Sequence, residues 1–567
     1  MRTADPLVYD AHAHGLAGNG TTNDQPALAA LVESLGAAYA ADGRPRTIRC
    51  PAGTYSIQDE GVRWRNGVSL IGAGAAATCF TLSNPERPTA PTPLATFTTR
   101  DHGAGRDNHI ADCTFAHFEI DGSGVTLPAY DVNAKGLFLQ YVLRGRFHDL
   151  YIHDTGATGF GCDFLQDTVV DGVLAVHCGR LNNGEEMGGA GIGIGIGGWG
   201  DTERLTITGC STVGNGTNGI FVELQKRRWT PPRGIRIIGC HAQGNRFGIS
   251  DWGADGLIVS ACTMTANHQA GYDVSALGTS SVAGRGGIVT GCVIDGNVWD
   301  GVAIGNTTGP YTVDGNRISR NGRYGYWQHS LGPSGLADRA DALGVARLAG
   351  SAEHPAADIA VTGNDIWGNA LDGVLIDSPV LDVCVAGNRV RSNGLQAAPG
   401  SDGGGATVSY TRLTMRDTAA KWLPDGHTGK MVAAGGQQAI VVANTATELI
   451  LAPVRPGAAT AWPEGTPPRE TRYRLPDAPS VRAGITLAAA ALAPTVRDNR
   501  AWDRGPHPTQ THGLRITGDG TCEAGRVHGN DLADNAVAPT AFDTAPVGGC
   551  WYHNLGIDPC PGGATGS

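Results

Sequence analysis

A glycine-led pentapeptide recurs eight times between residues 136 and 377, and apolar residues alternate with other types in most copies. The copies begin at Gly136, Gly159, Gly191, Gly219, Gly271, Gly301, Gly325 and Gly373. A sequence repeat of roughly 20–50 residues is typical of a solenoid, in which each repeat packs only against its neighbours. The pattern therefore predicts an all-β solenoid. It also indicates which side chains share one face.

The composition limits the partners of such a chain. The 567 residues include 85 glycines but no collagen-like period, and many short strands and turns would explain that content. The net charge of −11 argues against a nucleic-acid partner. No stretch of about 18 apolar residues is present, so we expect no membrane span.

The first residues do not form an apolar signal region. The sequence as it stands therefore predicts a cytoplasmic protein, or a secreted one if a signal peptide was trimmed. The oligomeric state is left open.

The 13 cysteines are concentrated at one repeat position. Five of them occupy it in successive repeats, namely Cys178, Cys210, Cys240, Cys262 and Cys292, and asparagines 316, 364 and 388 follow. No CxxC spacing is present, and free cysteine behaves as a small buried apolar residue. We predict a ladder of buried thiols rather than a metal site. Nearer the end, Cys550 and Cys560 could pair.

The first 60 residues have a characteristic order of elements. A short strand at Val8 precedes a loop with Gly18 and Gly20, and Asn23 or Asp24 is placed to cap a helix over residues 25–41. Residues 51–55 then read Pro-Ala-Gly-Thr-Tyr. This lead-in resembles the start of the pectate-lyase-like superfamily, and the resemblance implies a right-handed parallel β-helix with an N-terminal capping helix.

The repeat pattern also predicts how the chain is divided. Residues 1–60 form the N-terminal cap, and residues 61–395 form the β-helix. Residues 396–492 lose the repeat and read as a small inserted β-domain of alternating strands and turns. The final coils and an irregular tail occupy residues 493–567.

One row of side chains on the outer face carries the polar residues of the repeats. Because side chains alternate across a strand, the residue four places after each glycine points outward. The row reads Gln140, Asp163, Gly195, Glu223, Trp252, Ser275, Gly305, His329 and Asp377. Trp252 comes from a further coil at Gly248.

Two carboxylates of this row, Asp163 and Glu223, flank Gly195. Strands in a sheet lie about 4.8 Å apart, so their backbones should be roughly 9–10 Å apart. Inverting glycosidases hold their two carboxyl groups about 6.5–9.5 Å apart. The pattern also predicts a bare floor of outward glycines, at positions 161, 193, 195 and 197, on which a sugar ring could rest.

Other residues surround this predicted site. Phe138, Phe221, Trp199 and Trp252 offer aromatic faces for stacking on sugars, and Gln140 could bind substrate. Glu186 lies in a loop before the glycines, and Lys226 begins a basic run suited to an anionic substrate. Asp251 is expected to point inward, where a carboxylate must be paired or functional.

The segment 159–166 is similar in position to the catalytic segment of alginate C5-epimerases. Asp163 matches an aspartate of that segment, but Leu165 stands where the family has a histidine. The polygalacturonase signatures are not present as a set, and neither is the acidic trio with a basic residue of pectate lyases. No cofactor and no metal site are predicted.

The residues thus favour a glycoside hydrolase that acts on an oligo- or polysaccharide. Glu223 would be the acid and Asp163 the base or nucleophile, with Asp251 as a third catalytic candidate. A polysaccharide lyase or uronate epimerase is the alternative. A non-catalytic glycan-binding or tailspike-like protein is the third possibility.

Overall fold

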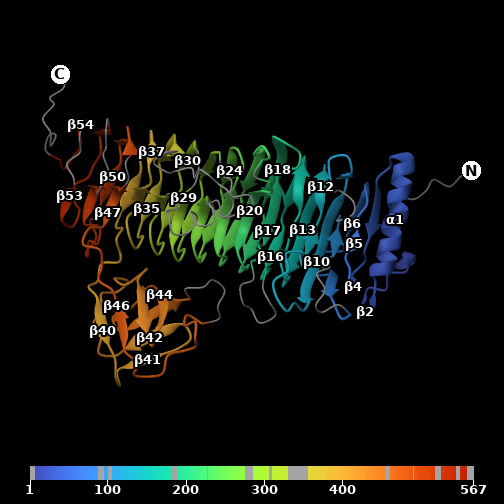
Figure 1. The fold of residues 1–567 in the computed structure, drawn as a ribbon, viewed down its shortest axis with the longest axis horizontal. Helices are drawn as coiled ribbons and strands as arrows, with labels where there is room; N and C mark the ends of the chain where they lie inside the picture. The colour runs from blue at the N-terminus through green and yellow to red at the C-terminus, as the bar shows by residue number, and fades with distance from the viewer. Residues whose placement is uncertain are drawn as a thin grey trace, which may run out of the picture. The chain divides into compact units, whose positions relative to one another are not determined.

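The computed structural model describes residues 7–86, 95–99, 105–179, 188–226, 228–274, 285–305, 309–329, 356–453, 460–488, 491–517, 525–543 and 549–557. The chain divides into two compact units close to residue 262. Within the described residues, none of the helices has the length and apolar character needed to cross a membrane. The strands of both units stack coil upon coil in parallel, so the predicted parallel β-helix is confirmed (Figure 1).

In the first unit, parallel strands follow one another along three faces of the coils. The first face holds β1 (Val8–Asp10), β3 (Arg46–Arg49), β6 (Val68–Ile71), β10 (Thr114–Gly124), β13 (Arg146–His153), β15 (Thr168–Asp171), β18 (Thr202–Thr208), β21 (Arg233–Ile238) and β24 (Leu257–Ser260). The second face holds β2 (Asn19–Asn23), β4 (Gly53–Gln58), β7 (Thr78–Ser83), the ends of β10 and β13, β16 (Leu174–Val176), β19 (Ser211–Val213) and β22 (His241–Gln243).

The third face carries the pentapeptides. It holds β5 (Val62–Arg63), β8 (Phe97–Thr98), β11 (Leu137–Phe138), β17 (Ile192–Ile196), β20 (Asn218–Leu224) and β23 (Phe247–Trp252). A separate sheet of three short strands holds β9 (Ile110–Ala111), β12 (Gln140–Leu143) and β14 (Asp163–Gln166). Strand β12 follows β11 of the third face directly in the chain.

The helix α1 (Gln25–Asp42) contacts strands β4, β5 and β6 in the first coils. It buries Leu28, Leu31, Val32 and Leu35 against them. Asp24 stands at its N-cap position, but its side chain makes no hydrogen bond to the helix. Of the two predicted capping residues it is Asn23 whose Oδ1 accepts a hydrogen bond of 3.1 Å from the backbone N–H of Gln25, the first residue of α1. The Asp24 carboxylate instead accepts hydrogen bonds from the backbone of Ala17, Gly18 and Ser56, and so joins the lead-in loop to β4. A 3-10 turn (η1, His12–His14) follows β1.

The second unit repeats the three faces. One holds β26 (Ala270–Val274), β29 (Asp300–Gly305), β32 (Tyr326–His329), β36 (Val374–Asp377), β47 (Ala483–Leu487), β51 (His512–Ile516) and β53 (Ala538–Phe542). The next holds β27 (Gly287–Thr290), β30 (Tyr311–Asp314), β34 (Ile359–Thr362), β38 (Cys384–Ala386), β49 (Thr495–Arg497), β52 (Arg526–His528) and β54 (Cys550–Tyr552). The third holds β25 (Thr263–Thr265), β28 (Val293–Asp295), β31 (Arg317–Ser319), β35 (Asp365–Trp367), β39 (Arg389–Arg391) and β50 (Arg500–Trp502), and a short sheet holds β33 (Ala356–Ala357), β37 (Val380–Leu381) and β48 (Ala491–Leu492).

Ladders of identical side chains join the coils at the turns. In the second unit, each buried Asn amide donates to the side-chain oxygen of the next coil, as from Asn316 to Asn364 at 3.0 Å and on to Asn388 at 3.0 Å. In the first unit the corresponding position holds buried thiols, such as Cys210 and Cys240, that point to backbone carbonyls. Burial raises the pKa of the Cys178 thiol to about 11, as expected for an unreactive core residue. Cys550 is exposed, whereas Cys560 lies outside the described residues.

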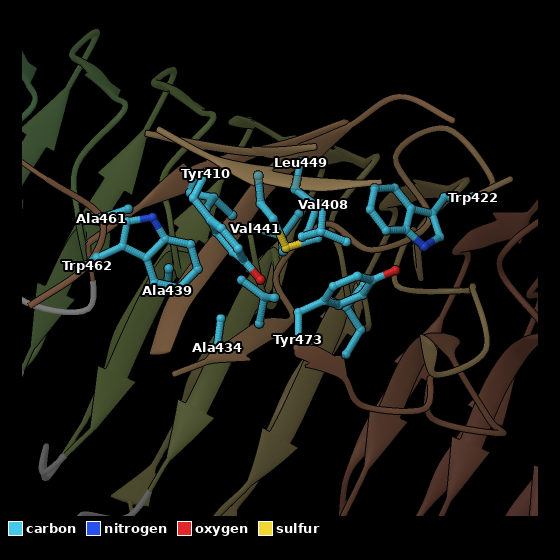
Figure 2. Close-up of a cluster of buried hydrophobic side chains, with 14 residues drawn as sticks. Val408, Tyr410, Trp422, Ala434, Ala439, Val441, Leu449, Ala461, Trp462 and Tyr473 are labelled. Carbon is cyan, nitrogen blue, oxygen red and sulfur yellow. The ribbon is translucent and has the colours of Figure 1, made fainter. Parts of the chain in front are cut away.

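An antiparallel sheet of seven strands is inserted between β39 and β47. It holds β40 (Ser401–Gly403), β41 (Val408–Tyr410), β42 (Thr414–Asp417), β43 (Met431–Ala434), β44 (Gln437–Asn444), β45 (Glu448–Ala452) and β46 (Tyr473–Leu475). Figure 2 shows its own apolar core, in which Tyr410, Trp462 and Tyr473 are almost fully buried. Strand β47 already pairs with β36 of the β-helix, so the antiparallel sheet ends before Ala483, inside the predicted range 396–492.

Candidate functional site

The strand register of the first unit places the predicted row side by side. Gln140 pairs with Asp163 across β12 and β14, and Gly195 pairs with Glu223 across β17 and β20. Glu223 in turn pairs with Trp252 on β23. Asp163 and Glu223 are only 8% and 7% exposed, so both carboxyl groups are set into the surface rather than extended into solvent.

Asp163 is held by neighbours on both sides. Its Oδ2 accepts a hydrogen bond of 3.0 Å from the Gln140 amide, and its Oδ1 accepts one of 2.8 Å from the backbone N–H of Gly195. The second contact shows that the side chain leans across Gly195, toward the strand that carries Glu223.

The predicted bare floor of glycines is wrong. A Cβ atom on Gly195 would lie 2.7 Å from Asp163 Oδ1 and 2.7 Å from Gln225 Cγ, so these side chains already cover the glycine. The ring of Phe221 covers Gly193 in the same way, and Leu224 covers Gly197. The glycines are needed because neighbouring side chains fill the space above them, which the pattern of one strand does not reveal.

Lys135 is a member of this site that the sequence analysis missed. Its side chain lies over Gly161, and its Nζ is 4.0 Å from Asp163 Oδ2. The ammonium also sits 4.0 Å from the centre of the Phe138 ring, within the range of a cation–π interaction. The residue precedes Gly136 by one position, outside the pentapeptide, and no motif marks it.

Glu223 has a different set of neighbours. Its Oε2 accepts a hydrogen bond of 3.1 Å from the Gln225 amide. Burial raises the pKa of Tyr130 to about 12, and the charge of Glu223 adds to this rise. Phe221 and Trp252 lie beside it as a pair of rings 5.1 Å apart, and both are partly exposed.

Asp251 is fully buried, as its register predicts. Its Oδ1 accepts hydrogen bonds from the backbone of Gly253 at 3.2 Å and Ala254 at 2.9 Å. These bonds stabilise the turn after β23. A catalytic role for Asp251 stays a prediction, and this position offers it no solvent-exposed surface for substrate.

A cluster of aromatic side chains adjoins Asp163 on the far side of β14. Trp199 donates from its indole to the carbonyl of Phe164 at 2.7 Å, and its ring packs edge-on to Tyr141. Trp229 packs edge-on to Phe164 at 5.5 Å. Tyr141 and Phe164 both have a left-handed backbone, with φ of 54° and 58°, which is rare for bulky residues. Strain of this kind is often found at functional sites.

A fully buried carboxyl group lies beneath this aromatic cluster. Glu203 Oε1 accepts hydrogen bonds from the backbone of Gly197 and Trp199, whereas Oε2 has no partner among the described residues. Burial raises the pKa of Glu203 to about 8, and the charge of Asp163 contributes. Glu203 therefore fixes the turn that presents Trp199.

The remaining predicted residues are less closely connected. Lys226 is exposed, and its Nζ lies 4.7 Å from the centre of the Trp229 ring. Glu186 and Ser275 lie outside the described residues. In the second unit, His329 pairs with Asp377 in register, and its ring covers Gly305.

Leu165, which stands where the epimerase family has a histidine, is part of the core. Its side chain is fully buried and has no titratable group, so it cannot transfer a proton to a substrate. What the site offers instead is two carboxyl groups, one lysine and two glutamines, with aromatic rings beside them.

Comparison with known proteins gives several matches. A family model described as a right handed beta helix region matches residues 230–334. The mannuronan C5-epimerase AlgE3 of Azotobacter vinelandii is 25% identical over 203 residues, which are 30% of this chain and 10% of that protein. The chain thus matches only about a tenth of that relative's length.

Solved structures are also similar to this chain. The A-module of the mannuronan C-5 epimerase AlgE4 of Azotobacter vinelandii has a TM-score of 0.39 and 12% identity, with 97% of this chain and all of that chain covered. The family 28 exopolygalacturonase of Yersinia enterocolitica has a TM-score of 0.45 and 12% identity, with 68% of this chain and 75% of that chain covered.

Proposed function

Because the chain is a right-handed parallel β-helix protein of the pectate-lyase-like kind, we propose that it is a carbohydrate-active enzyme acting on a polysaccharide. Its site would be centred on Asp163 and Glu223. The observation that supports this assignment is the position of the Asp163 side chain, which leans over Gly195 toward the strand of Glu223. A pair of carboxyl groups on the two strands that flank β17 suits the hydrolysis of a glycosidic bond.

The proposed chemistry is hydrolysis. Both oxygens of Asp163 accept hydrogen bonds, from Gln140 and Gly195, so in this arrangement Asp163 acts as an acceptor and suits the role of base or nucleophile. Glu223 would protonate the leaving oxygen. Phe221 and Trp252, beside Glu223, would stack on the sugar ring of the leaving group.

Lys135 favours a second candidate, proton abstraction from a uronate by a lyase or an epimerase. Its ammonium group could bind the carboxylate of a uronic acid, which makes the neighbouring C–H more acidic. The partial similarity to a mannuronan C5-epimerase supports this candidate. The buried Leu165 weighs against it, because this core residue stands where that family has its proton-transfer histidine.

Analysis of the products separates the two candidates. Neutral and uronate-containing polysaccharides are incubated with the protein in deuterated water. Hydrolysis gives new reducing ends with saturated sugars, a lyase gives an unsaturated uronide, and an epimerase gives deuterium at C5 without cleavage. The hydrolase proposal is overturned if deuterium enters C5 or if an unsaturated product forms.

The residue assignment is tested with Asp163→Asn and Glu223→Gln. Asp167→Asn is the matched control, because Asp167 lies on the same coil but forms an exposed ion pair with Arg204. We expect both site variants to lose turnover and the control to retain it. Full turnover by both site variants would refute the site.

A further inference from the structure

A compact cluster of polar side chains lies on a different face of the first unit, at the ends of β10, β13 and β16. Glu119 and Asp121 point from β10, and His153 follows from β13 in register with Asp121. Asp154 comes next in the chain, and His177 follows β16. The proposed catalytic pair uses none of these side chains.

His153 is the centre of the cluster. Its Nε2 lies 3.0 Å from Glu119 Oε1, and its Nδ1 lies 2.7 Å from Asp154 Oδ2 and 3.8 Å from Asp121 Oδ1. The ring stacks on Tyr151 with centroids 4.5 Å apart, which fixes its orientation. His153 is only 14% exposed, so the ring cannot turn away freely.

The charges of the cluster do not balance. Three carboxyl groups carry up to three negative charges, whereas the His153 imidazole carries at most one positive charge. In the described part of the chain, one other group that can be cationic lies within 4.0 Å of these carboxyl groups. It is His177, whose Nδ1 lies 3.9 Å from Asp154 Oδ1. A divalent cation at this place would offset the excess negative charge.

The two ring nitrogens of His153 have separate partners, as in a carboxylate–histidine–metal arrangement. A histidine that binds a metal usually donates its other N–H to a carboxylate, which holds the ring in place. Glu119 occupies that position at Nε2. Nδ1 then faces Asp121 and Asp154, and one ligand atom from each of these three residues lies within 4.8 Å of the others.

The two distances from His153 Nδ1 to the Asp121 and Asp154 carboxylates bracket the spacing of a zinc site. Tetrahedral zinc, with bonds of about 2.0–2.1 Å, holds its ligand atoms about 3.3 Å apart. Asp121 would have to move about 0.5 Å toward His153, and Asp154 about 0.6 Å away, which a small side-chain rotation supplies. His177 is 59% exposed and therefore free to rotate toward the same point as a fourth ligand.

We propose that Asp121, His153 and Asp154 form a binding site for a zinc-like divalent metal ion, with His177 as the fourth ligand and Glu119 holding the His153 ring. Imidazole nitrogen suits zinc, whereas calcium and magnesium prefer sites made only of oxygen. The ion would join three successive coils of the first unit and stabilise their stacking. The site would be structural, because it lies on a face other than that of Asp163.

Zinc titration of the metal-stripped full-length protein tests the proposal. Isothermal titration with zinc chloride should show one more tight site in the wild type than in the double variant Asp121→Asn, Asp154→Asn. Glu119→Gln should keep the site but weaken it by roughly 10–100-fold, because it disturbs only the ring-holding contact. Cobalt(II) should give a visible absorption band that His153→Gln abolishes.

The matched control is Asp149→Asn. Asp149 lies 2.7 Å from His117, also on β10 and β13, and within the described segments no other ion pair of the His117 ring is found. Zinc binding should be unchanged in this variant. Thermal unfolding in the presence of a chelator checks that every variant is folded. The proposal is overturned if the wild type and the double variant bind zinc equally, or if calcium binds the site as tightly as zinc.

Discussion

Two faces of the first unit place carboxyl groups in opposite surroundings. On the face of Asp163 and Glu223, both residues are buried, with the Asp163 side chain 11% exposed, and their carboxyl groups accept hydrogen bonds from neutral amides. On the face of Asp121 and Asp154, the carboxyl groups are 24% and 45% exposed and converge on one histidine. The first arrangement holds each acid separately, as the proposed substrate site requires, whereas the second concentrates negative charge around one histidine.

Of the changes on the face of Asp163 and Glu223, replacement of Asp163 by asparagine should have the largest effect on activity. Asparagine keeps the size but cannot act as a base or nucleophile, so turnover of the cleaved polysaccharide should fall by about 10²–10⁴-fold. Stability should fall by about 1–3 kcal/mol, because the new amide NH2 group faces one of the two donors that Asp163 accepts from. The measurement is kcat/KM with purified protein. An unchanged value would show that the face of Asp163 is no more involved in catalysis than the face of Asp121 and Asp154.

Gly195→Ala should reduce activity without removing any polar group. The new Cβ would lie 2.7 Å from Asp163 Oδ1, so the carboxylate must move away from β20. A misplacement of this size can cost about 100-fold in rate, and the crowding about 1–3 kcal/mol of stability. Gly105→Ala is the control, because no atom lies within 4 Å of the added carbon. Equal activity of the two variants would contradict the description of Gly195.

Because of Glu203, the stability of the folded protein should depend on pH. The pKa of its carboxyl group is about 8 in the folded protein and 4.5 in the unfolded chain. Between these values the folded state keeps a proton that the unfolded chain releases, so stability falls as the pH rises through this window. The loss is about 5 kcal/mol at most, from a pKa difference of about 3.5 at about 1.4 kcal/mol per unit.

Denaturant unfolding of the wild type and of Glu203→Gln, at several pH values from 5 to about 9, measures this effect. Glutamine retains the acceptor for Gly197 and Trp199 and does not titrate. The difference in stability between the two proteins should therefore shift in favour of the variant as the pH rises. A constant difference would show that Glu203 is ionised throughout.

Asp154→Asn should have the smallest effect, provided that metal is absent. The side chain is 45% exposed, and an exposed ion pair contributes about 0–1 kcal/mol. Activity should not change. Thermal unfolding in chelator and a standard activity assay test this prediction. A large loss of stability or of activity would mean that the face of Asp121 and Asp154 supports the face of Asp163 and Glu223.

The repeat in the sequence is sufficient to predict the parallel coils and the register of the polar row. Alternation along a strand correctly predicts that Asp251 is buried and that Glu223 lies beside Trp252. It does not predict what lies above a residue. Lys135 reaches Asp163 from outside the repeat, and the glycines are covered by side chains of the next coil, such as Phe221 over Gly193.

The histidine cluster was missed for a related reason. Glu119 and His153 are 34 residues apart in sequence, and only the register of β10 with β13 brings them together. No short motif can mark ligands that come from successive coils. The inserted antiparallel sheet was easier to predict, because it interrupts the repeat and alternates on its own.

The most direct test of the proposed function is a structure of the Glu223→Gln variant with a bound oligosaccharide from a polysaccharide that the protein cleaves. The proposal predicts a glycosidic bond between Asp163 and residue 223, with a sugar ring stacked on Phe221 or Trp252. An oligosaccharide bound elsewhere, with Asp163 still held by Gln140 and Gly195 and in contact with no sugar, would contradict it.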